Sequence, residues 1–406
     1  MQVDKRKFEV AILSIFLFAF FRQYMIVNQG LIFIATIPLG IFILSTFFEK
    51  NWLFGKLRFV SLILLFAVVY GFLFHEFIDD RVNERGQASV HDSVAMTDYA
   101  TKSLLIGQNP YDISFENVLK GQRFYNNSQP TSVLNSYVYS PLNFIINTPF
   151  YLVSNSIFGF VDTRISLLSL FILSAVVGLL IVQEKILFLI VFLFNPIFAH
   201  SFFIGVNDVL PLFFLISIVV MLYFKKITWA TILLGLSVGT KLTVYPFVFL
   251  YFLYLINIYS KKRERFKLVL RQAFGFILIS GIIYLPFLIW NKEELIKDIF
   301  IYPVAGGEQS YPITGILGIP QLLLNHGVIS AQTSFPFFLF QPFIVVGVLF
   351  FSNRYFKKHL QLASLLFLYV IFFIVSFVFQ RVFQPNYLDF LSQVLIFSAF
   401  IKGKKE

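Results

Sequence analysis

The amino-acid sequence predicts an all-α integral membrane protein, and three observations carry that prediction. Hydrophobic residues make up 58% of the 406 residues, whereas charged residues make up only 13%. A soluble domain has about 45–50% apolar and about 25% charged residues, so a soluble fold is excluded. The apolar residues also fall into long runs, and basic residues separate many of these runs. The absence of cysteine excludes a disulfide-stapled scaffold.

Twelve apolar segments are predicted to be membrane spans, because a helix needs about 20 apolar residues to cross the hydrocarbon layer. The segments are residues 8–27, 30–48, 59–77, 165–182, 186–204, 208–224, 227–240, 242–259, 272–290, 335–351, 362–379 and 387–401. The apolar segment 141–158 is a thirteenth candidate, but Pro141 and Pro149 favour a broken surface helix over a regular span. We therefore predict about 12 transmembrane helices.

Lysine and arginine residues predict the orientation of these helices. The basic clusters lie at residues 5–7, 50–58, 225–226, 261–267, 354–358 and 402–405. Cytoplasmic loops of membrane proteins carry an excess of Lys and Arg. All six clusters share one face only if 141–158 stays on the opposite surface. The sequence thus predicts a multi-pass protein of the cell membrane with both termini cytoplasmic. Its net charge of +11 then reflects orientation, not binding to nucleic acid.

Two polar segments are predicted on the extracytoplasmic face of a single integral membrane domain, residues 1–406. The first, 78–163, is expected to contain two amphipathic juxtamembrane helices. One lies in MTDYATKSLLIG, with Gly107 at its end and a turn at Asn109-Pro110-Tyr111, and the other follows Tyr139-Ser140-Pro141. The second segment is 291–334. Connections this long are usually functional or disordered, so we expect the active site on this face.

Polar residues at the outer ends of the spans are the candidate site residues. Asp92 precedes the first amphipathic helix and is next to His91, while Asp98 lies inside that helix. Lys241 and Arg381 lie at the outer ends of apolar spans, where an ionisable residue is costly and usually functional. Each either binds an anionic group or extends to the lipid headgroups.

The string HDSVAMTDYATKSLLIGQNPY resembles the first external loop of the GT-C superfamily of integral membrane glycosyltransferases. It is similar in particular to the polyprenol-phosphate-mannose-dependent mannosyltransferases, which have an Asp, paired leucines and then Gly-x-x-Pro-Tyr. The matching residues here are Asp92, Leu104-Leu105 and Gly107 to Tyr111. Further matches are Tyr139-Ser140-Pro141-Leu142, Gly205-Val206-Asn207-Asp208 and a Gly-Leu segment that contains Lys241. The resemblance covers the first loop and the middle third of the chain.

The resemblance implies a GT-C-like fold and transfer, with inversion, of mannose or another hexose from a polyprenyl-phosphate donor. The acceptor would be a glycolipid, a glycan or a protein, as in cell-envelope glycan biosynthesis, and membrane lipids would surround the enzyme. The implied general base is Asp92, with Asp98 in reserve, because a positioned carboxylate can accept the proton of the attacking hydroxyl. Lys241 and Arg381 would stabilise the leaving phosphate.

The remaining candidates for substrate binding are His91, Tyr111, Tyr139, Asn207 and Asp208. Asn207 and Asp208 either bind sugar hydroxyls or cap the span that they precede. No cofactor is expected, because the lipid-linked sugar is itself the substrate. The sequence predicts no metal site, since cysteine is absent and no paired His spacing occurs. A requirement for a divalent metal ion is left open.

Two other functions remain open. A polymerase or ligase of lipid-linked glycans also has about twelve spans, but its large external loop usually comes late in the chain. A flippase or transporter of polyprenyl-linked lipids suits twelve spans, but internal repeats are expected of such a protein. The sequence shows no such repeats.

Overall fold

The computed structural model describes residues 5–24, 29–47, 52–82, 90–119, 134–260, 263–307, 310–315 and 317–403. These residues confirm the all-α fold class. The first half contains α1 (Lys5–Tyr24), α2 (Gln29–Phe47), α3 (Trp52–Val82), α4 (Asp92–Leu105), α5 (Glu116–Leu119), α7 (Leu142–Phe158), α8 (Thr163–Gly178), α9 (Lys185–Leu193) and α10 (Pro196–Ile204). In the described residues, the strands are limited to two short segments, β1 (Thr314–Gly315) and β2 (Val382–Phe383), which pair in parallel.

The second half of the chain is also helical. It contains α11 (Val209–Tyr223), α12 (Ile227–Ser237), η2 (Leu242–Val244), α13 (Tyr245–Ile258), α14 (Arg265–Ile296), η3 (Lys297–Ile301), α15 (Ile319–Asn325), η4 (Phe337–Phe340), α16 (Gln341–Phe356), α17 (Leu362–Val378) and α18 (Pro385–Phe400). The helix α14 continues past the predicted span end at residue 290, with a kink at Asn291. The first part of the predicted polar segment 291–334 is therefore helical as far as Ile301.

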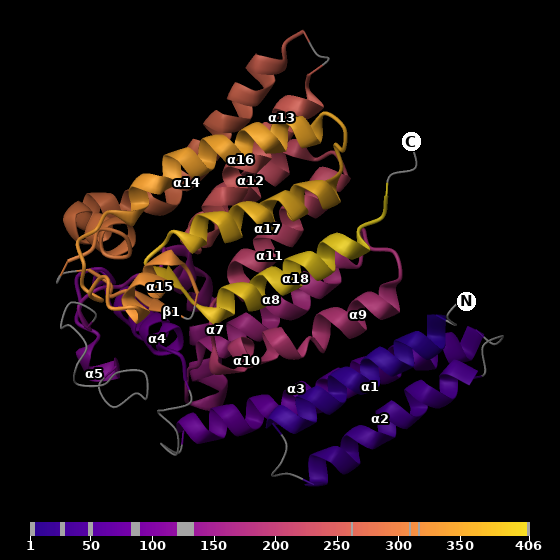
Figure 1. Cartoon of the computed structure of the whole chain (residues 1–406). Helices are drawn as coiled ribbons and strands as arrows, with labels where there is room; N and C mark the ends of the chain where they lie inside the picture. The colour runs from indigo at the N-terminus through magenta and orange to yellow at the C-terminus, as the bar shows by residue number, and fades with distance from the viewer. Residues whose placement is uncertain are drawn as a thin grey trace.

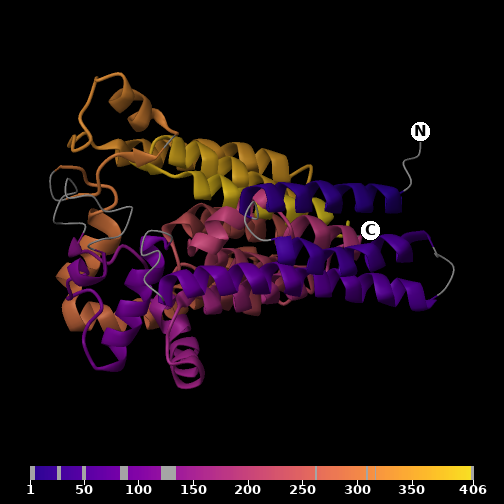
Figure 2. The same cartoon turned by 90° about the horizontal axis from the view of Figure 1, so that it is seen from below.

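The long helices form a bundle with two distinct ends (Figures 1 and 2). Helix α1 begins and helix α18 ends at one end, whereas α4, α5, α15 and β1 lie at the other end. At the first end, Lys5 forms an ion pair with Glu184, and Val182 pairs with Ile401. We call this the terminal end of the bundle, and the opposite end the loop end.

Three helices within the described residues are long and apolar enough to cross a membrane: Trp52–Glu76, Arg265–Ile301 and Phe337–Phe356. The number rises to five if the bent pairs α7–α8 and α9–α10 each form one span. Five further apolar helices have 10–17 residues. The long apolar helices indicate a helical membrane protein. All twelve predicted segments overlap helices, but twelve membrane crossings stay a prediction.

Helix α7 does not continue the direction of α8. The two helices are bent by 118° at the break between Phe158 and Thr163, and Figure 2 shows α7 running across the bundle direction. Its polar side is buried through Asn143, Asn147 and Ser154, whereas Leu152 and Ile157 are exposed. Helix α7 continues without a break through Pro149, so the predicted break inside 141–158 is wrong. The location of this helix on the membrane surface stays a prediction.

The two amphipathic helices predicted for the first polar segment are present as α4 and α7. Helix α4 ends at Leu105, and Gly107 follows with a φ of 78°, a left-handed conformation that glycine adopts without a steric penalty. The Asn109 side chain then accepts a hydrogen bond from the backbone N–H of Tyr111 (3.1 Å), which makes the predicted turn. The local sequence signals were therefore correct here.

Candidate active site

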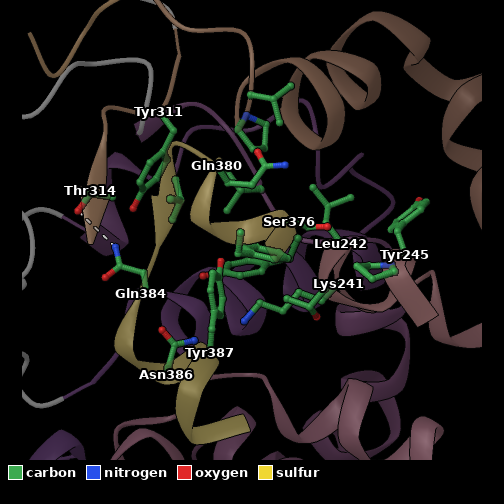
Figure 3. Close-up of a pocket in the computed structure, with 18 of the residues that line it drawn as sticks. Lys241, Leu242, Tyr245, Tyr311, Thr314, Ser376, Gln380, Gln384, Asn386 and Tyr387 are labelled. Atoms are coloured by element: carbon green, nitrogen blue, oxygen red, sulfur yellow. Dashed lines mark hydrogen bonds between the residues drawn. The ribbon is translucent and has the colours of Figure 1, made fainter. Parts of the chain in front are cut away.

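A cavity of about 1090 Å³ lies where the helices meet the loop end of the bundle. Its walls come from α10, η2, α13, α16, α17 and α18, together with segments 91–92, 138–139, 300–304 and 311–314. Figure 3 shows these side chains around a shared space. Of the site residues predicted from the sequence, the cavity wall includes His91, Asp92, Tyr139 and Lys241.

Asp92 forms one polar corner of the cavity, at the first residue of α4. Its Oδ1 lies 2.7 Å from Nδ1 of His91 and accepts a hydrogen bond from the Tyr139 hydroxyl (3.1 Å). His91 is the N-cap residue of α4, and its backbone N–H donates to the carbonyl of Ile204 at the end of α10 (2.7 Å). The carboxylate is therefore held by residues from three separate parts of the chain.

The surroundings of Asp92 favour its ionised form. Burial raises the pKa of this carboxyl, but the charge and hydrogen bond of His91, with the Tyr139 hydroxyl and the Ser93 N–H, lower it below its ordinary value overall. Burial also raises the pKa of the Tyr311 hydroxyl, another residue of the cavity wall, and the charge of Asp92 raises it further. Asp92 thus carries a negative charge at neutral pH, and this charge acts on the Tyr311 hydroxyl.

Lys241 forms the second polar corner. Its ammonium donates to Oδ1 of Asp208 (2.5 Å) and lies 5.2 Å from the centroid of the Tyr387 ring. Asn386 donates its side-chain N–H to the other carboxylate oxygen of Asp208 (2.6 Å). Figure 3 shows the Lys241 side chain extending toward Tyr387 and Asn386. Lys241 therefore points into the site and does not extend away from the protein, as a headgroup contact would require.

Asp208 supports Lys241 from behind the cavity wall. It occupies the N-cap position of α11, but its side chain makes no capping hydrogen bond. The capping alternative predicted for Asp208 is therefore wrong. A carboxylate that is 2% exposed beside an ammonium fixes the position of that ammonium. Asp208 is accordingly a support for the cationic corner and does not itself line the cavity.

Apolar side chains form another part of the cavity wall. They come from α13, η3, η4, α16 and α17, and include Phe249, Phe300, Phe338, Val345 and Phe372. Phe249, Phe300 and Phe338 are also 44%, 41% and 41% exposed on the protein surface. An apolar surface that runs from outside into a cavity suits a ligand with a hydrocarbon part. We call this surface the apolar mouth.

Asp98 lies outside the cavity, in a buried network of charged and polar groups. It accepts hydrogen bonds from Thr163 Oγ1 (2.6 Å) and Asn147 Nδ2 (3.3 Å), and it forms an ion pair with Arg81 (2.8 Å). Arg81 also forms an ion pair with Asp162 (2.8 Å), which joins the network to the start of α8. The structure thus gives Asp98 a connecting position between α3, α4, α7 and α8.

Three other predicted site residues do not line the cavity. The Tyr111 hydroxyl donates to the backbone carbonyl of Tyr139 (2.9 Å), so Tyr111 supports a residue of the site from behind. Asn207 is buried and donates to the Asn143 side chain (2.9 Å). The Arg381 guanidinium is also buried, and it donates to the backbone carbonyls of Tyr311, Ala331 and Thr333. The geometry does not support direct substrate contact by these three side chains.

Several cavity residues were missed by the sequence analysis. Tyr311, Gln384, Asn386 and Tyr387 all contribute side chains to the wall. Asn386 and Tyr387 follow Gln384-Pro385 at the start of an apolar span, and a polar pair at that position is the signal that was available. Among the described residues, no group of three or more His, Asp or Glu side chains is arranged to hold a metal ion.

The fold and the cavity together define a helical membrane protein with one acidic and one cationic corner beside an apolar mouth. No protein-family model matches the chain, and no curated protein or solved structure is significantly similar to it. The similarity to GT-C glycosyltransferases therefore depends on the motifs of the sequence.

Proposed function

We propose that this protein transfers a sugar from a polyprenyl-phosphate carrier to an acceptor hydroxyl within the cavity. The observation that carries the proposal is the presence of Asp92 and Lys241 in one cavity with an apolar mouth. The lipid chain would lie against Phe249, Phe300 and Phe338, and the phosphate would lie near Lys241. The acceptor hydroxyl would lie near Asp92.

The chemical step follows from these positions. The acceptor oxygen attacks the anomeric carbon of the sugar while its proton moves to the Asp92 carboxylate. The bond between that carbon and the phosphate oxygen breaks, and the electron pair leaves with polyprenyl phosphate. Lys241 stabilises the charge that develops on the departing phosphate, because an oriented cation is most effective where water is excluded. Asp92 is preferred over Asp98 as the base, since Asp98 does not line the cavity.

The direct test is to incubate the purified protein with polyprenyl-phosphate mannose, glucose or arabinose, each with a mixture of membrane glycolipids. Release of polyprenyl phosphate together with a glycosylated product is the expected result for one of the sugars. A protein that binds these donors but releases no polyprenyl phosphate with any acceptor would contradict the proposal. Protein with Asp92→Asn serves as the control for contaminating transferases.

We expect Lys241→Ala to weaken donor binding by about tenfold to a hundredfold, because a hydrogen bond from a charged group contributes about 1.5–3 kcal/mol. The measurement is the Kd for polyprenyl phosphate in detergent. Lys297→Ala is the matched control, since Lys297 lies near the same end of the bundle but outside the cavity wall. The double variant Lys241→Ala with Asp208→Asn removes the unpaired carboxylate, and it should still bind weakly. Unchanged affinity in both Lys241 variants would exclude Lys241 as the phosphate contact.

A transporter of lipid-linked sugars is the second candidate, because of one observation in α18. Asp389 lies in this apolar helix and accepts a hydrogen bond from Ser201 on α10. Helices α9 and α10 are bent by 50° at Asn195-Pro196, and Asn195 donates to Ser392 (2.9 Å). A broken helix that faces an intramembrane carboxylate is common at transport sites. Movement of a fluorescent polyprenyl-phosphate lipid across proteoliposomes, without product formation, would favour this candidate.

A further inference from the structure

Arg381 is a buried cation that binds backbone carbonyls. Its side chain is 1% exposed, and its Nε, Nη1 and Nη2 donate to the carbonyls of Tyr311 (3.3 Å), Thr333 (2.7 Å) and Ala331 (3.1 Å). Within the described parts of the chain, no carboxylate lies within ion-pair distance of this guanidinium. Burying a charge without a carboxylate partner is costly, so these three hydrogen bonds are the main local compensation.

The backbone of Arg381 holds the same connection. Its carbonyl accepts a hydrogen bond from the N–H of Thr314 (3.1 Å), next to the pairing of β1 with β2. The Gln384 side chain donates to Thr314 Oγ1 (3.3 Å), a bond that Figure 3 shows. Tyr311 and Thr314 both line the cavity. One residue at the start of β2 thus fixes two segments that are distant from it in the sequence.

Of these two segments, Tyr311–Thr314 contributes Tyr311 and Thr314 to the cavity wall, whereas Ala331–Thr333 does not line the cavity. The N–H of Ile313 donates to the carbonyl of Ala331 (2.9 Å), which joins the two segments. The apolar mouth is formed by different elements, namely α13, η3, η4, α16 and α17. Tyr311 lies close enough to Asp92 for the carboxylate charge to influence its hydroxyl. The cavity therefore has an apolar mouth suited to a lipid and a separate wall segment, Tyr311–Thr314, that Arg381 and Ala331–Thr333 hold in place.

We propose that Arg381 is a positioning residue that straps Tyr311–Thr314 to Ala331–Thr333, and that the wall segment held in this way, which we call the cover, controls access of the hydroxyl-bearing acceptor. The donor would reach the cavity through the apolar mouth, without moving the cover. The identity of the controlled ligand rests on the proposed function. The strapping role rests only on the contacts of Arg381.

Two neighbouring glycines provide a matched pair of variants that leave Arg381 in place. Gly306 and Gly307 have φ angles of 83° and 90°, so an alanine is strained at either position. A Cβ at Gly306 would lie 2.8 Å from Nη1 of Arg381 and 2.7 Å from the carbonyl of Thr333, whereas one at Gly307 meets nothing within 4 Å. Gly306→Ala should therefore disturb the strap, while Gly307→Ala controls for backbone strain.

The first experiment measures access to the cavity and does not depend on enzyme activity. The chain contains no cysteine, so a single Val138→Cys substitution places one thiol in the cavity wall. We expect a charged, water-soluble thiol reagent to label this cysteine on the order of tenfold faster in Arg381→Gln and Gly306→Ala, because hydrogen bonds of the strap are lost. Arg381→Lys keeps the charge without the three-way geometry and should label at an intermediate rate.

Equal labelling of the parent protein, Arg381→Gln and Gly306→Ala would overturn the strapping role. If Arg381→Gln fails to fold, the comparison of Gly306→Ala with Gly307→Ala decides the question. Equal acceleration by both glycine variants would assign the effect to backbone strain and would also overturn the proposal.

The second experiment measures sugar transfer in the same variants. Arg381→Gln is expected to raise the KM for the acceptor several-fold and to leave the KM for the polyprenyl-phosphate donor unchanged. A general loss of structure would instead change both constants. Equal increases in both KM values would contradict selective control of the acceptor. Faster labelling in a protein that performs no transfer would uphold the strap and reject the proposed function, so the two failures can be told apart.

Discussion

Replacing Asp92 by asparagine is expected to slow sugar transfer by about 10²–10⁴-fold while the protein remains folded. A positioned general base contributes about this factor, and an amide cannot accept the proton of the acceptor hydroxyl. Asparagine is nearly the same size as aspartate and can still accept the hydrogen bond from Tyr139 that Oδ1 accepts at 3.1 Å. The measurement is single-turnover release of polyprenyl phosphate from the donor.

Asp112→Asn is the matched control for this prediction. Asp112 is an exposed carboxylate of the same polar segment and does not line the cavity. The Asp112→Asn variant should transfer sugar at the parental rate. The Tyr139→Phe variant should lose much less activity than Asp92→Asn. Parental transfer by purified Asp92→Asn protein would remove Asp92 from the mechanism.

The pH dependence of transfer gives a second view of the same residue. The pKa of Asp92 lies below its ordinary value, so the carboxylate is ionised throughout the range from pH 5 to pH 7. An ionised carboxylate is the active form of a general base, so activity that depends on Asp92 is lost only as pH falls through its lowered pKa. A marked loss between pH 7 and pH 5 would assign proton removal to another group. His91 would then be the first residue to test, because it lies next to Asp92 in the cavity wall.

Local sequence signals were sufficient to predict the helices that carry the site. Gly107 and the turn at Asn109 mark the end of α4, and Pro141 marks the start of α7, although α7 continues unbroken through Pro149. These signals depend on backbone conformation and on the membrane preference of nearby side chains. Backbone conformation and membrane preference both depend on only a few neighbouring residues, so the sequence is enough to predict their effects.

The composition of the site was predicted only in part, because contacts between distant segments leave no local pattern. Lys241 is 33 residues from Asp208 in the chain, and Asn386 is 178 residues from it, yet the three form one cluster. Lys241 was predicted to be a site residue because a charge between apolar spans is energetically costly and usually functional. Asn386 and Tyr387 carry no charge, so the same argument could not identify them.

Arg381 shows how a correct position can lead to an unsupported role. Its place at the end of a span indicated either an anion-binding residue or a contact with the lipid headgroups, whereas the side chain is buried in the protein. A guanidinium can bind a phosphate or backbone carbonyls with the same donors. Whether Arg381 binds a phosphate or backbone carbonyls depends on how the connection after η3 folds back toward it. The sequence of Arg381 and its neighbours does not determine that fold. Asp98 is similar, since its partners Arg81 and Thr163 come from two other helices.

The second large effect concerns stability: Asp162→Asn is expected to destabilise the protein by about 3–5 kcal/mol. Asp162 accepts hydrogen bonds from the backbone N–H (2.8 Å), Nε (2.9 Å) and Nη2 (2.8 Å) of Arg164, and it forms an ion pair with Arg81. The side chains of Asp162 and Arg164 are each 1% exposed. Removal of the carboxylate charge therefore leaves a buried guanidinium without its counter-ion. The measurement is thermal unfolding in detergent.

Asp98→Asn separates this effect from a general loss of charge in the network. Burial raises the pKa of Asp98, whereas Arg164 and Arg81 lower the pKa of Asp162 despite its burial. An amide at position 98 keeps one acceptor oxygen for Thr163, and Arg81 keeps Asp162 as a counter-ion, so Asp98→Asn should cost less than Asp162→Asn. Because the folded-state pKa of Asp162 is depressed, its stabilisation is present above the unfolded-state pKa of about 3.9 and is lost as pH falls through the folded value. The difference in stability between the parent protein and Asp162→Asn should therefore stay constant from pH 8 to pH 5 and become smaller only in stronger acid. Equal unfolding temperatures for Asp162→Asn and Asp98→Asn would show that the ion pair of Asp162 with Arg164 does not dominate the network.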